Sequence, residues 1–261
     1  MVSNVSSVPR LRVFAGPNGS GKSTIKDMLP PQWLGIYINP DEIEKTLRAS
    51  GRLELSAFGI DVGTAAGLPD FMRRSSLLAR AGLLGEIDRV CLDTEAATAV
   101  ARFPDIEINS YHASVLADFI RHGLLDARVS CTFETVMSSP DKIEFMRKAR
   151  QAGFRTYLYY VATQDPDINI ARVSHRVRTG GHPVPQDRIV SRYHRSLSLL
   201  SQAVTQANRA YLFDNSGHER VWIAEITEGQ ELELHTDRVP AWLTETTLWQ
   251  SFVEPEPSDL T

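Results

Sequence analysis

The chain has 261 residues, 42% of them hydrophobic and 23% charged, which suffices for one large α/β domain with a sizeable core. Its formal net charge of −4 provides no overall basic field, which argues against nucleic acid as a partner. The two cysteines have neither a metal nor a redox spacing, which argues against a zinc site or disulfide framework and favours a cytoplasmic location. We also expect no secretion signal and no membrane span, because residues 1–9 lack an apolar region and no run reaches spanning length.

The first informative stretch is residues 11–24. The apolar run LRVFA predicts a buried strand, and the next eight letters, GPNGSGKS, match G-x-x-x-x-G-K-[ST] without a mismatch. Glycines let successive backbone N–H groups point at phosphate oxygens, Lys22 reaches the β and γ phosphates, and the Ser23 hydroxyl can bind Mg²⁺. A helical stretch is expected over residues 24–29, so a plain surface turn is the weaker interpretation. The sequence predicts a nucleoside triphosphate site formed by Gly16, Pro17, Asn18, Gly19, Ser20, Gly21, Lys22, Ser23 and Thr24.

A second buried strand is expected at residues 35–38, followed by a helix over residues 40–48 with Asn39 as its N-cap. Asp41 therefore follows the carboxyl end of a strand. In open parallel sheets that edge forms the ligand crevice, and it is the edge that carries the phosphate loop. The alternative is that Asp41 and Glu42 only complement the helix dipole. Position alone leaves both interpretations open.

The pattern weakens over residues 51–107, which we interpret as an insertion into the α/β core. A helix is expected over residues 71–84 and a short strand over residues 89–92. Asp93 follows that strand and is interpreted as a solvated turn residue rather than a metal ligand, because turns favour aspartate.

Helices and strands alternate again from Asn109. A helix over residues 111–122 ends at Gly123, and a buried strand over residues 128–133 delivers Glu134 and Thr135 at its end. A helix from Ser139-Pro140 to residue 152 and a strand over residues 154–162 follow, then a last core strand at residues 210–213 and a hairpin at residues 221–235. The expected fold class is α/β: a P-loop NTPase-type parallel sheet flanked by helices, with an inserted mainly helical segment and a small C-terminal β extension.

Residues 163–208 predict two helices that start at Asp165-Pro166 and at Pro185, joined by a glycine pair. Arg172 and Arg176 share one face of the first helix. Such a pair resembles a hinged lid over an anionic ligand, where guanidinium groups stabilise the charge that develops on a transferring phosphate. The alternative is a solvated basic face, and the phosphate loop favours the lid. Arg172 and Arg176 are the first catalytic candidates.

Residues 10–235 are expected to form a single P-loop kinase domain, with the insertion at about residues 51–107. Residues 236–261 are expected to form a closing segment anchored by Trp242 and Trp249, and a disordered tail from residue 254.

Five segments in this order resemble the zeta toxin family of P-loop kinases: AGPNGSGKST, YINPDEI, FETVMSS, RVSHRVRTGGHPVPQDRIVSRYHRSL and LFDNSG. Within that family the chain most resembles the compact bacterial branch formerly labelled predicted ABC-type ATPases. The resemblance covers roughly residues 10–50 and 108–226, and residues 51–107 are longer than is usual for that branch.

The resemblance implies a cytoplasmic kinase that uses ATP or GTP with Mg²⁺ to phosphorylate the sugar of UDP-N-acetylglucosamine, and an antitoxin that covers the nucleotide site. It implies that Asp41 acts as the base on the sugar hydroxyl, that Glu134, with Thr135 beside it, contacts the substrate, and that Arg172 or Arg176 contacts the phosphates. A second family arginine, near the glycine pair, has no counterpart in this chain. The candidate replacements are Arg178, Arg188 and His182.

The expected function is a Mg-dependent phosphotransferase that moves the γ-phosphate of ATP or GTP to a hydroxyl of a small acceptor, as the toxin of a toxin–antitoxin pair. The UDP-N-acetyl sugar is one candidate acceptor. The main alternative is a nucleotide-binding ATPase or switch protein without a small-molecule acceptor. A transporter-type ATPase would need an apolar run ending in Asp-Glu and a Ser-Gly-Gly signature, and the sequence has neither. Net acidity argues against a nucleic-acid end kinase.

Overall fold

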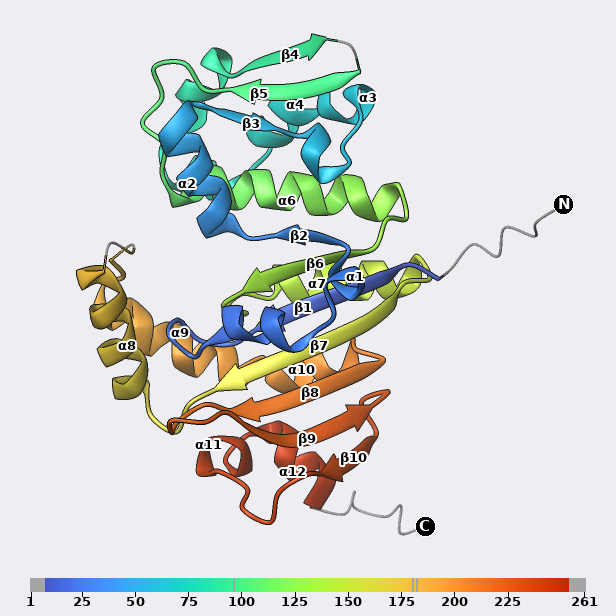
Figure 1. The fold of residues 1–261 in the computed structure, drawn as a ribbon, viewed down its shortest axis with the longest axis vertical. Coiled ribbons are helices and arrows are strands. Elements are labelled where there is room, and N and C mark those ends of the chain that lie inside the picture. The colour runs from blue at the N-terminus through green and yellow to red at the C-terminus, as the bar shows by residue number, and fades with distance from the viewer. Residues whose placement is uncertain (1–7, 96, 180, 182, 254–261) are drawn as a thin grey trace, which may run out of the picture. The chain divides into compact units, whose positions relative to one another are not determined.

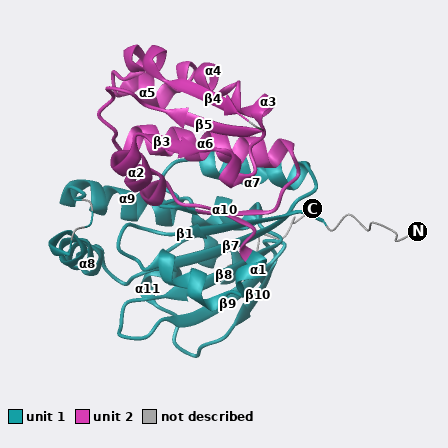
Figure 2. Ribbon diagram, turned by 45° about the horizontal axis from the view of Figure 1, so that its top comes forward, with its two compact units in different colours: residues 1–33, 134–261 teal, residues 34–133 magenta. Residues whose placement is uncertain are grey.

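The computed structural model describes residues 8–95, 97–179, 181 and 183–253, so the tail from residue 254 lies outside the described part (Figure 1). The chain divides into two compact units (Figure 2). Unit 1 comprises residues 1–33 and 134–261, and unit 2 comprises residues 34–133. The single domain expected over residues 10–235 stays a prediction.

The sheet of unit 1 has the strand order β10-β9-β8-β7-β1. Its strands β1 (Arg10–Ala15), β7 (Arg155–Ala162) and β8 (Arg209–Asp214) run parallel. The strands β9 (Val221–Thr227) and β10 (Glu231–Leu234) are antiparallel and form the predicted hairpin. The expected α/β class and its small C-terminal β extension are therefore confirmed.

One face of this sheet forms the apolar core of unit 1. Alternate side chains of the parallel strands point into that core and are almost fully buried; they are Leu11, Val13, Leu158, Tyr160, Ala210 and Leu212. The helices of this part are η1 (Lys22–Met28), α1 (Pro31–Leu34), α7 (Asp141–Gln151), α8 (Pro166–Arg178), α9 (Gln186–Ser198), α10 (Leu200–Thr205), α11 (Ala241–Thr244) and α12 (Thr247–Val253). Of these, α9 and α10 lie behind the sheet in the view of Figure 1. The hydroxyls of Tyr160 and Ser196 meet at 2.9 Å and tie α9 to the core.

Within unit 1 the closing segment is anchored by Trp242, one of the two tryptophans expected to do so. This side chain is buried, and its indole Nε1 donates to Asp214 Oδ1 at 2.9 Å. A buried indole N–H needs such a partner, so the bond fixes α11 at the end of β8. None of the helices described here has the length and apolar character that crossing a bilayer requires.

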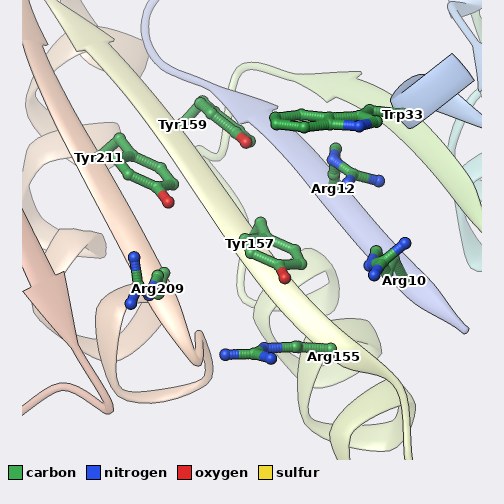
Figure 3. Close-up of a pocket in the computed structure, with 8 residues that line it drawn as sticks. All are labelled: Arg10, Arg12, Trp33, Arg155, Tyr157, Tyr159, Arg209 and Tyr211. Atoms are coloured by element: carbon green, nitrogen blue, oxygen red, sulfur yellow. The ribbon is translucent and has the colours of Figure 1, made fainter. Parts of the chain in front are cut away.

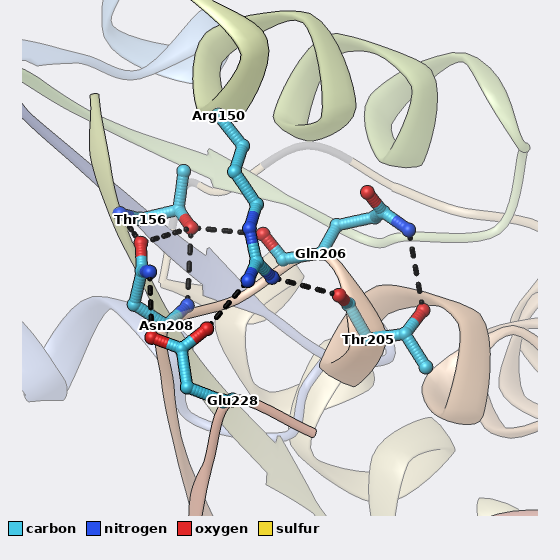
Figure 4. A network of polar contacts seen from close by, with 6 residues as sticks. All are labelled: Arg150, Thr156, Thr205, Gln206, Asn208 and Glu228. Carbon is cyan, nitrogen blue, oxygen red and sulfur yellow. Dashed lines mark hydrogen bonds and ion pairs between the residues drawn. The ribbon is translucent and has the colours of Figure 1, made fainter. Parts of the chain in front are cut away.

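A polar network joins the starts of β7 and β8 to the hairpin turn (Figure 4). Asn208 is its centre: its Oδ1 accepts from Thr156 N at 2.8 Å, and its Nδ2 donates to Glu228 Oε1 at 2.8 Å. Arg150 of α7 donates to Thr205 O at 3.0 Å and to the second carboxylate oxygen of Glu228. Because Thr156 is fully buried, water cannot replace these bonds if one is lost.

We expect Asn208→Ala to lower the free energy of unfolding by about 2 kcal/mol, because it leaves the buried Thr156 N–H without its acceptor. Urea unfolding followed by circular dichroism measures this change. Gln206→Ala is the matched control: Gln206 gives the network its main-chain carbonyl, and its side chain bonds to Thr205 at the surface. The control should change stability by less than about 0.5 kcal/mol. Equal stability of the two variants would contradict the role of the Asn208 amide.

Unit 2 contains a parallel pair of strands, β2 (Ile36–Ile38) and the greater part of β6 (Cys131–Thr135), with Ile36 opposite Cys131. Both strands were predicted. The long helix α6 (Ser110–Asp126) packs against β2, and α2 (Pro40–Ser50) packs against α6.

The predicted end of the long helix at Gly123 is wrong. The helix α6 continues to Asp126, because Leu124 and Leu125 after the glycine are buried with its apolar face. A Cβ on Gly123 would come within 2.7 Å of Ile60 Cδ1. This glycine therefore serves close packing inside the helix rather than termination.

The insertion contains an antiparallel sheet that the sequence did not predict. Its strand order is β3-β5-β4, with β3 (Arg52–Glu54), β5 (Thr98–Arg102) and β4 (Cys91–Glu95). The short helices beside it are η2 (Ser56–Phe58), α3 (Val62–Ala65), α4 (Leu68–Arg73), α5 (Ser76–Arg80) and η3 (Leu84–Arg89).

Two local predictions in the insertion are wrong. The helix expected over residues 71–84 is divided, because Ser75 accepts from Leu78 N at 3.3 Å and caps α5 as a separate helix. Asp93 is not a turn residue. It lies within β4, where its Oδ2 is 2.7 Å from Arg102 Nε, so a cross-strand ion pair explains the aspartate.

Candidate nucleotide site

The predicted phosphate loop leaves the end of β1 and needs glycine at three positions. Gly16, Gly19 and Gly21 all have positive φ, at 139°, 75° and 94°. A Cβ on Gly16 would lie 2.0 Å from Val161 O, and one on Gly19 would lie 2.7 Å from Asn169 O. The neighbouring backbone therefore excludes any side chain, which explains why the motif has glycine here.

The loop is held from outside by two asparagine amides that sequence reasoning missed. Asn169 of α8 donates from Nδ2 to Asn18 O at 2.6 Å, and its own oxygen accepts from Thr163 Oγ1. Asn215, after β8, donates from Nδ2 to Ser20 O at 2.7 Å. These bonds occupy loop carbonyls and leave loop N–H groups available for an anion. The only sequence signal for Asn215 was its place in the LFDNSG segment.

We expect Asn169→Ala to weaken nucleotide binding roughly tenfold and to lower the free energy of unfolding by about 2 kcal/mol. Asn169 is fully buried, and its loss leaves the carbonyl of Asn18 without its donor and the hydroxyl of Thr163 with only the longer bond to Asp165 O at 3.4 Å. Calorimetric titration with ATP and urea unfolding measure the two effects. Gln164→Ala, an exposed change before α8, is the control and should leave both quantities unchanged. Wild-type ATP affinity in Asn169→Ala would show that the loop needs no such support.

Lys22 spans the loop. Its Nζ donates to Gly16 O and to Pro17 O, each at 2.9 Å. The ammonium charge therefore lies against the loop that the motif assigns to phosphates. The helix that follows, η1, is a 3₁₀ helix that begins at Lys22, two residues before the predicted helical stretch.

Ser23 is paired with Glu134. The Ser23 hydroxyl donates to Glu134 Oε2 at 3.1 Å, and the glutamate is only 9% exposed. A hydroxyl and a carboxylate oxygen are hard donors of the kind that Mg²⁺ prefers, so the residues present fit that ion. Within the described ranges no three His, Cys, Asp or Glu side chains gather as a metal-binding group. A cation here would therefore take its other ligands from phosphate oxygens and water.

Thr135 follows Glu134 and stabilises a strained turn. Its Oγ1 accepts from Met137 N at 3.0 Å, and the buried Met137 has a φ of 53°, which is rare for a bulky side chain. Backbone strain of this kind is concentrated at functional sites. The turn at Met137 bends the chain shortly after Glu134. Because the Thr135 oxygen acts as an acceptor there, its hydroxyl proton remains available for donation.

The two candidate lid arginines differ in their surroundings. The predicted helix start is confirmed, since Asp165 Oδ1 accepts from Asp167 N at 2.7 Å and caps α8. Arg172 is half-buried: its Nη2 donates to Gly217 O at 3.3 Å, while its Nη1 is buried and has no hydrogen-bond partner in the described part of the chain. Arg176 is exposed. A half-buried guanidinium whose buried Nη1 lacks a partner favours Arg172 as the phosphate contact.

The structure describes both predicted lid helices, α8 and α9, and part of the segment between them. Arg178 and Arg188 are both exposed, and α9 begins after Pro185 as predicted. Gly180 and His182 lie outside the described residues, so His182 as the replacement for the second family arginine stays a prediction.

Arg220 is a further cation at the loop that the sequence did not indicate. It donates to Thr24 Oγ1, and burial lowers the pKa of its guanidinium. It lies in the turn between β8 and β9, far in sequence from the motif, so no spacing rule could have found it. Lys22, Arg172 and Arg220 together give the loop a positive environment.

Asp41 belongs to unit 2. Its local prediction is correct: Asn39 Oδ1 accepts from Asp41 N at 2.9 Å, Pro40 is the first residue of α2, and the aspartate is exposed. Its carboxylate is therefore open to an acceptor molecule. That it faces the phosphate loop stays a prediction.

A sheet of mostly parallel strands whose first strand runs into such a glycine loop is of the P-loop NTPase type. The comparisons with known proteins agree. The model of the zeta toxin family matches residues 106–227, which confirms the resemblance seen in the sequence.

Two solved structures share this fold. Both are chains of the AvrRxo1-ORF1:AvrRxo1-ORF2 complex, one with sulphate ions and one with ATP, and both have a TM-score of 0.51. The identities are 17% and 16%; the matches cover 88% of this chain in each case, and 62% and 61% of those chains. An uncharacterized protein of Haemophilus influenzae is 31% identical over 72 residues, 28% of this chain and 51% of that protein. The chain thus spans about half the length of this relative and about three-fifths of the solved chains.

Proposed function

We propose that the protein is a Mg-dependent phosphotransferase that moves the γ-phosphate of ATP to a hydroxyl of a small acceptor. The observation that carries the proposal is the bond from Ser23, at the end of a complete phosphate-loop motif, to Glu134 of β6. It brings a hydroxyl and a carboxylate together at the loop, beside cationic side chains. Phosphoryl transfer depends mainly on such positioning and electrostatics.

The phosphate loop and Arg172 of α8 have separate roles in binding the phosphates. The N–H groups of residues 18–19 and 21–23 bind the β and γ phosphates, and the Lys22 ammonium neutralises their charge. Arg172 offers its open Nη1 to the phosphate that is transferred. Cationic donors at this place stabilise the charge that develops in the transition state.

Ser23 and Glu134 would hold the metal ion. Held there, the ion would supply positive charge that offsets the negative charge of the phosphates. This assigns Glu134 to the metal side of the site, in addition to the substrate contact that the family resemblance implies. Thr135 can donate its proton to the acceptor, since its oxygen is held by Met137 N.

Asp41 is the proposed base. An exposed carboxylate in the first turn of α2 can accept the proton of a sugar hydroxyl as that hydroxyl attacks the γ-phosphate. A UDP-N-acetyl sugar is the first acceptor to test, following the family match. GTP is the alternative donor.

A protein partner is also proposed. The zeta toxin match implies an antitoxin, and the AvrRxo1-ORF1 structures are complexes with a second chain, AvrRxo1-ORF2. The expected arrangement is a toxin kinase whose nucleotide site is covered by the partner, in the cytoplasm.

Mass spectrometry of a reaction with γ-labelled ATP, Mg²⁺ and a small-metabolite pool that includes UDP-sugars tests the function. We expect one metabolite to gain one labelled phosphate, and ATP consumption to depend on that metabolite. Equal ATP hydrolysis with and without the pool, and no phosphorylated metabolite, would favour the ATPase or switch alternative.

A further inference from the structure

The second face of the unit 1 sheet carries an unusual set of residues near the start of its parallel strands. The register places Arg10 beside Arg155, and Tyr157 between Arg12 and Arg209. With Tyr159, Tyr211 and Trp33 of α1, these side chains line a cavity of about 360 Å³ (Figure 3). That volume is within the range of small-molecule sites, roughly 300–1,000 Å³.

The cavity has an excess of positive charge. Of its four arginines, Arg209 is paired with Glu225, whose Oε1 is 2.7 Å from Arg209 Nη1. No ion pair joins Arg12 or Arg155 to a carboxylate among the described residues. Like charges on neighbouring strands repel, so this cluster is more stable with an anion bound.

Among the residues that line the cavity, Arg12 gives the strongest evidence for a ligand. It is only 4% exposed, and its Nε is buried with no hydrogen-bond partner in the described ranges. Its guanidinium carbon lies 5.1 Å from the centre of the Tyr157 ring. Burying a cation with an unpaired N–H costs free energy unless a ligand accepts a hydrogen bond from that N–H.

The aromatic members supply flat surfaces beside this charge. Tyr159 and Tyr211 stack with ring centres 4.9 Å apart, and Trp33 is 50% exposed beside Arg12 (Figure 3). Burial raises the pKa of Tyr159 to about 12, so its hydroxyl stays neutral. Exposed aromatic rings and guanidinium planes are the groups on which nucleic bases stack.

We propose that this cavity is a second ligand site, which binds a nucleoside diphosphate with its phosphates on Arg12 and Arg155 and its base against Trp33. The arginines provide forked donors for phosphate, and the indole provides a stacking surface. The site is separate from the phosphate loop. Arg12 precedes Gly16 by four residues on an extended strand, which corresponds to about 13 Å.

Calorimetric titration with ADP tests the site by counting the bound equivalents. We expect two in the wild type and one in Lys22→Ala, where the phosphate loop is disabled. Arg155→Ala in the Lys22→Ala background should weaken the remaining binding roughly tenfold or more, because it removes charged hydrogen bonds to phosphate. Arg155 is exposed, so this variant is expected to fold even if Arg12→Met does not. Arg238→Ala, an exposed arginine outside the cavity, is the matched control.

Two further measurements distinguish the contribution of the phosphate contacts from that of the base contact. In the Lys22→Ala protein, ADP should bind more tightly than pyrophosphate or adenosine, and Trp33→Phe should remove the tryptophan fluorescence change that ADP causes. A wild type that binds a single equivalent, or equal affinity in the Arg155→Ala and Arg238→Ala backgrounds, would overturn the proposal. Equal affinity for ADP and pyrophosphate would overturn the stacking of the base.

Discussion

Lys22→Ala is expected to reduce phosphate transfer by at least about a hundredfold to a thousandfold, the effect of removing one preorganised donor from a transition state. The Lys22 ammonium is held against the loop by Gly16 O and Pro17 O, so its charge is already placed when a triphosphate enters. Alanine leaves those carbonyls in place and removes the charge that opposes their partial negative charge. The loop then has less attraction for the β and γ phosphates.

Two measurements check this expectation: ATP affinity by calorimetry and phosphorylated product by mass spectrometry. The matched control is Lys148→Ala, which removes an exposed lysine on α7 of the same unit. The control should behave as the wild type in both measurements. Full transfer by Lys22→Ala, with the control also active, would refute the role of the phosphate loop.

Asp41→Asn is expected to bind ATP normally and to lose transfer by about a hundredfold or more, in line with typical acid–base contributions. Asparagine keeps the size of the side chain and the cap bond from Asp41 N to Asn39 Oδ1, because that bond uses the backbone of residue 41. The carboxylate that accepts the proton of the acceptor hydroxyl is lost. Nucleotide affinity should not change, since the residues proposed to bind ATP belong to the phosphate loop.

Glu42→Gln is the control that separates the two interpretations of Asp41. Both acids lie in the first turn of α2, so a dipole contribution would be similar for the two. We expect kcat for the phosphorylated product to fall in Asp41→Asn and to stay near the wild-type value in Glu42→Gln. Equal and small effects in both variants would reduce Asp41 to a partner of the helix dipole.

The sequence predicted those parts of the site that depend on local chain geometry. The phosphate loop was recognisable because Gly16, Gly19 and Gly21 must adopt positive φ at fixed spacing. Asn39 and Asp165 were recognisable as caps because a cap bonds to the backbone two residues away. Such signals need no knowledge of the tertiary fold.

The parts that were missed depend on long-range contacts. Asn169 and Asn215 hold the loop across sequence separations of 151 and 195 residues, and a single amide in a helix or turn gives no sign of such a partner. In the insertion the sequence predicted only a short strand over residues 89–92, which overlaps β4. The sheet itself was missed because its strands are short and β4 has no buried residue, so the hydrophobic alternation is weak. The arginines of the second cavity were missed for the same reason as the asparagines, since only the strand register brings Arg10 beside Arg155.

The proposed kinase mechanism requires the Asp41 carboxylate to reach the γ-phosphate, and a crystal structure with a non-hydrolysable ATP analogue and Mg²⁺ tests this requirement directly. We predict that the γ-phosphate lies on the loop beside Ser23 and Glu134, with the Asp41 carboxylate about 6 Å from its phosphorus. That distance is the sum of two lengths: the hydrogen bond from the carboxylate to the acceptor hydroxyl, and the near-attack distance from the hydroxyl oxygen to the phosphorus. An Asp41 carboxylate at the opposite edge of the sheet from the γ-phosphate would contradict the kinase mechanism.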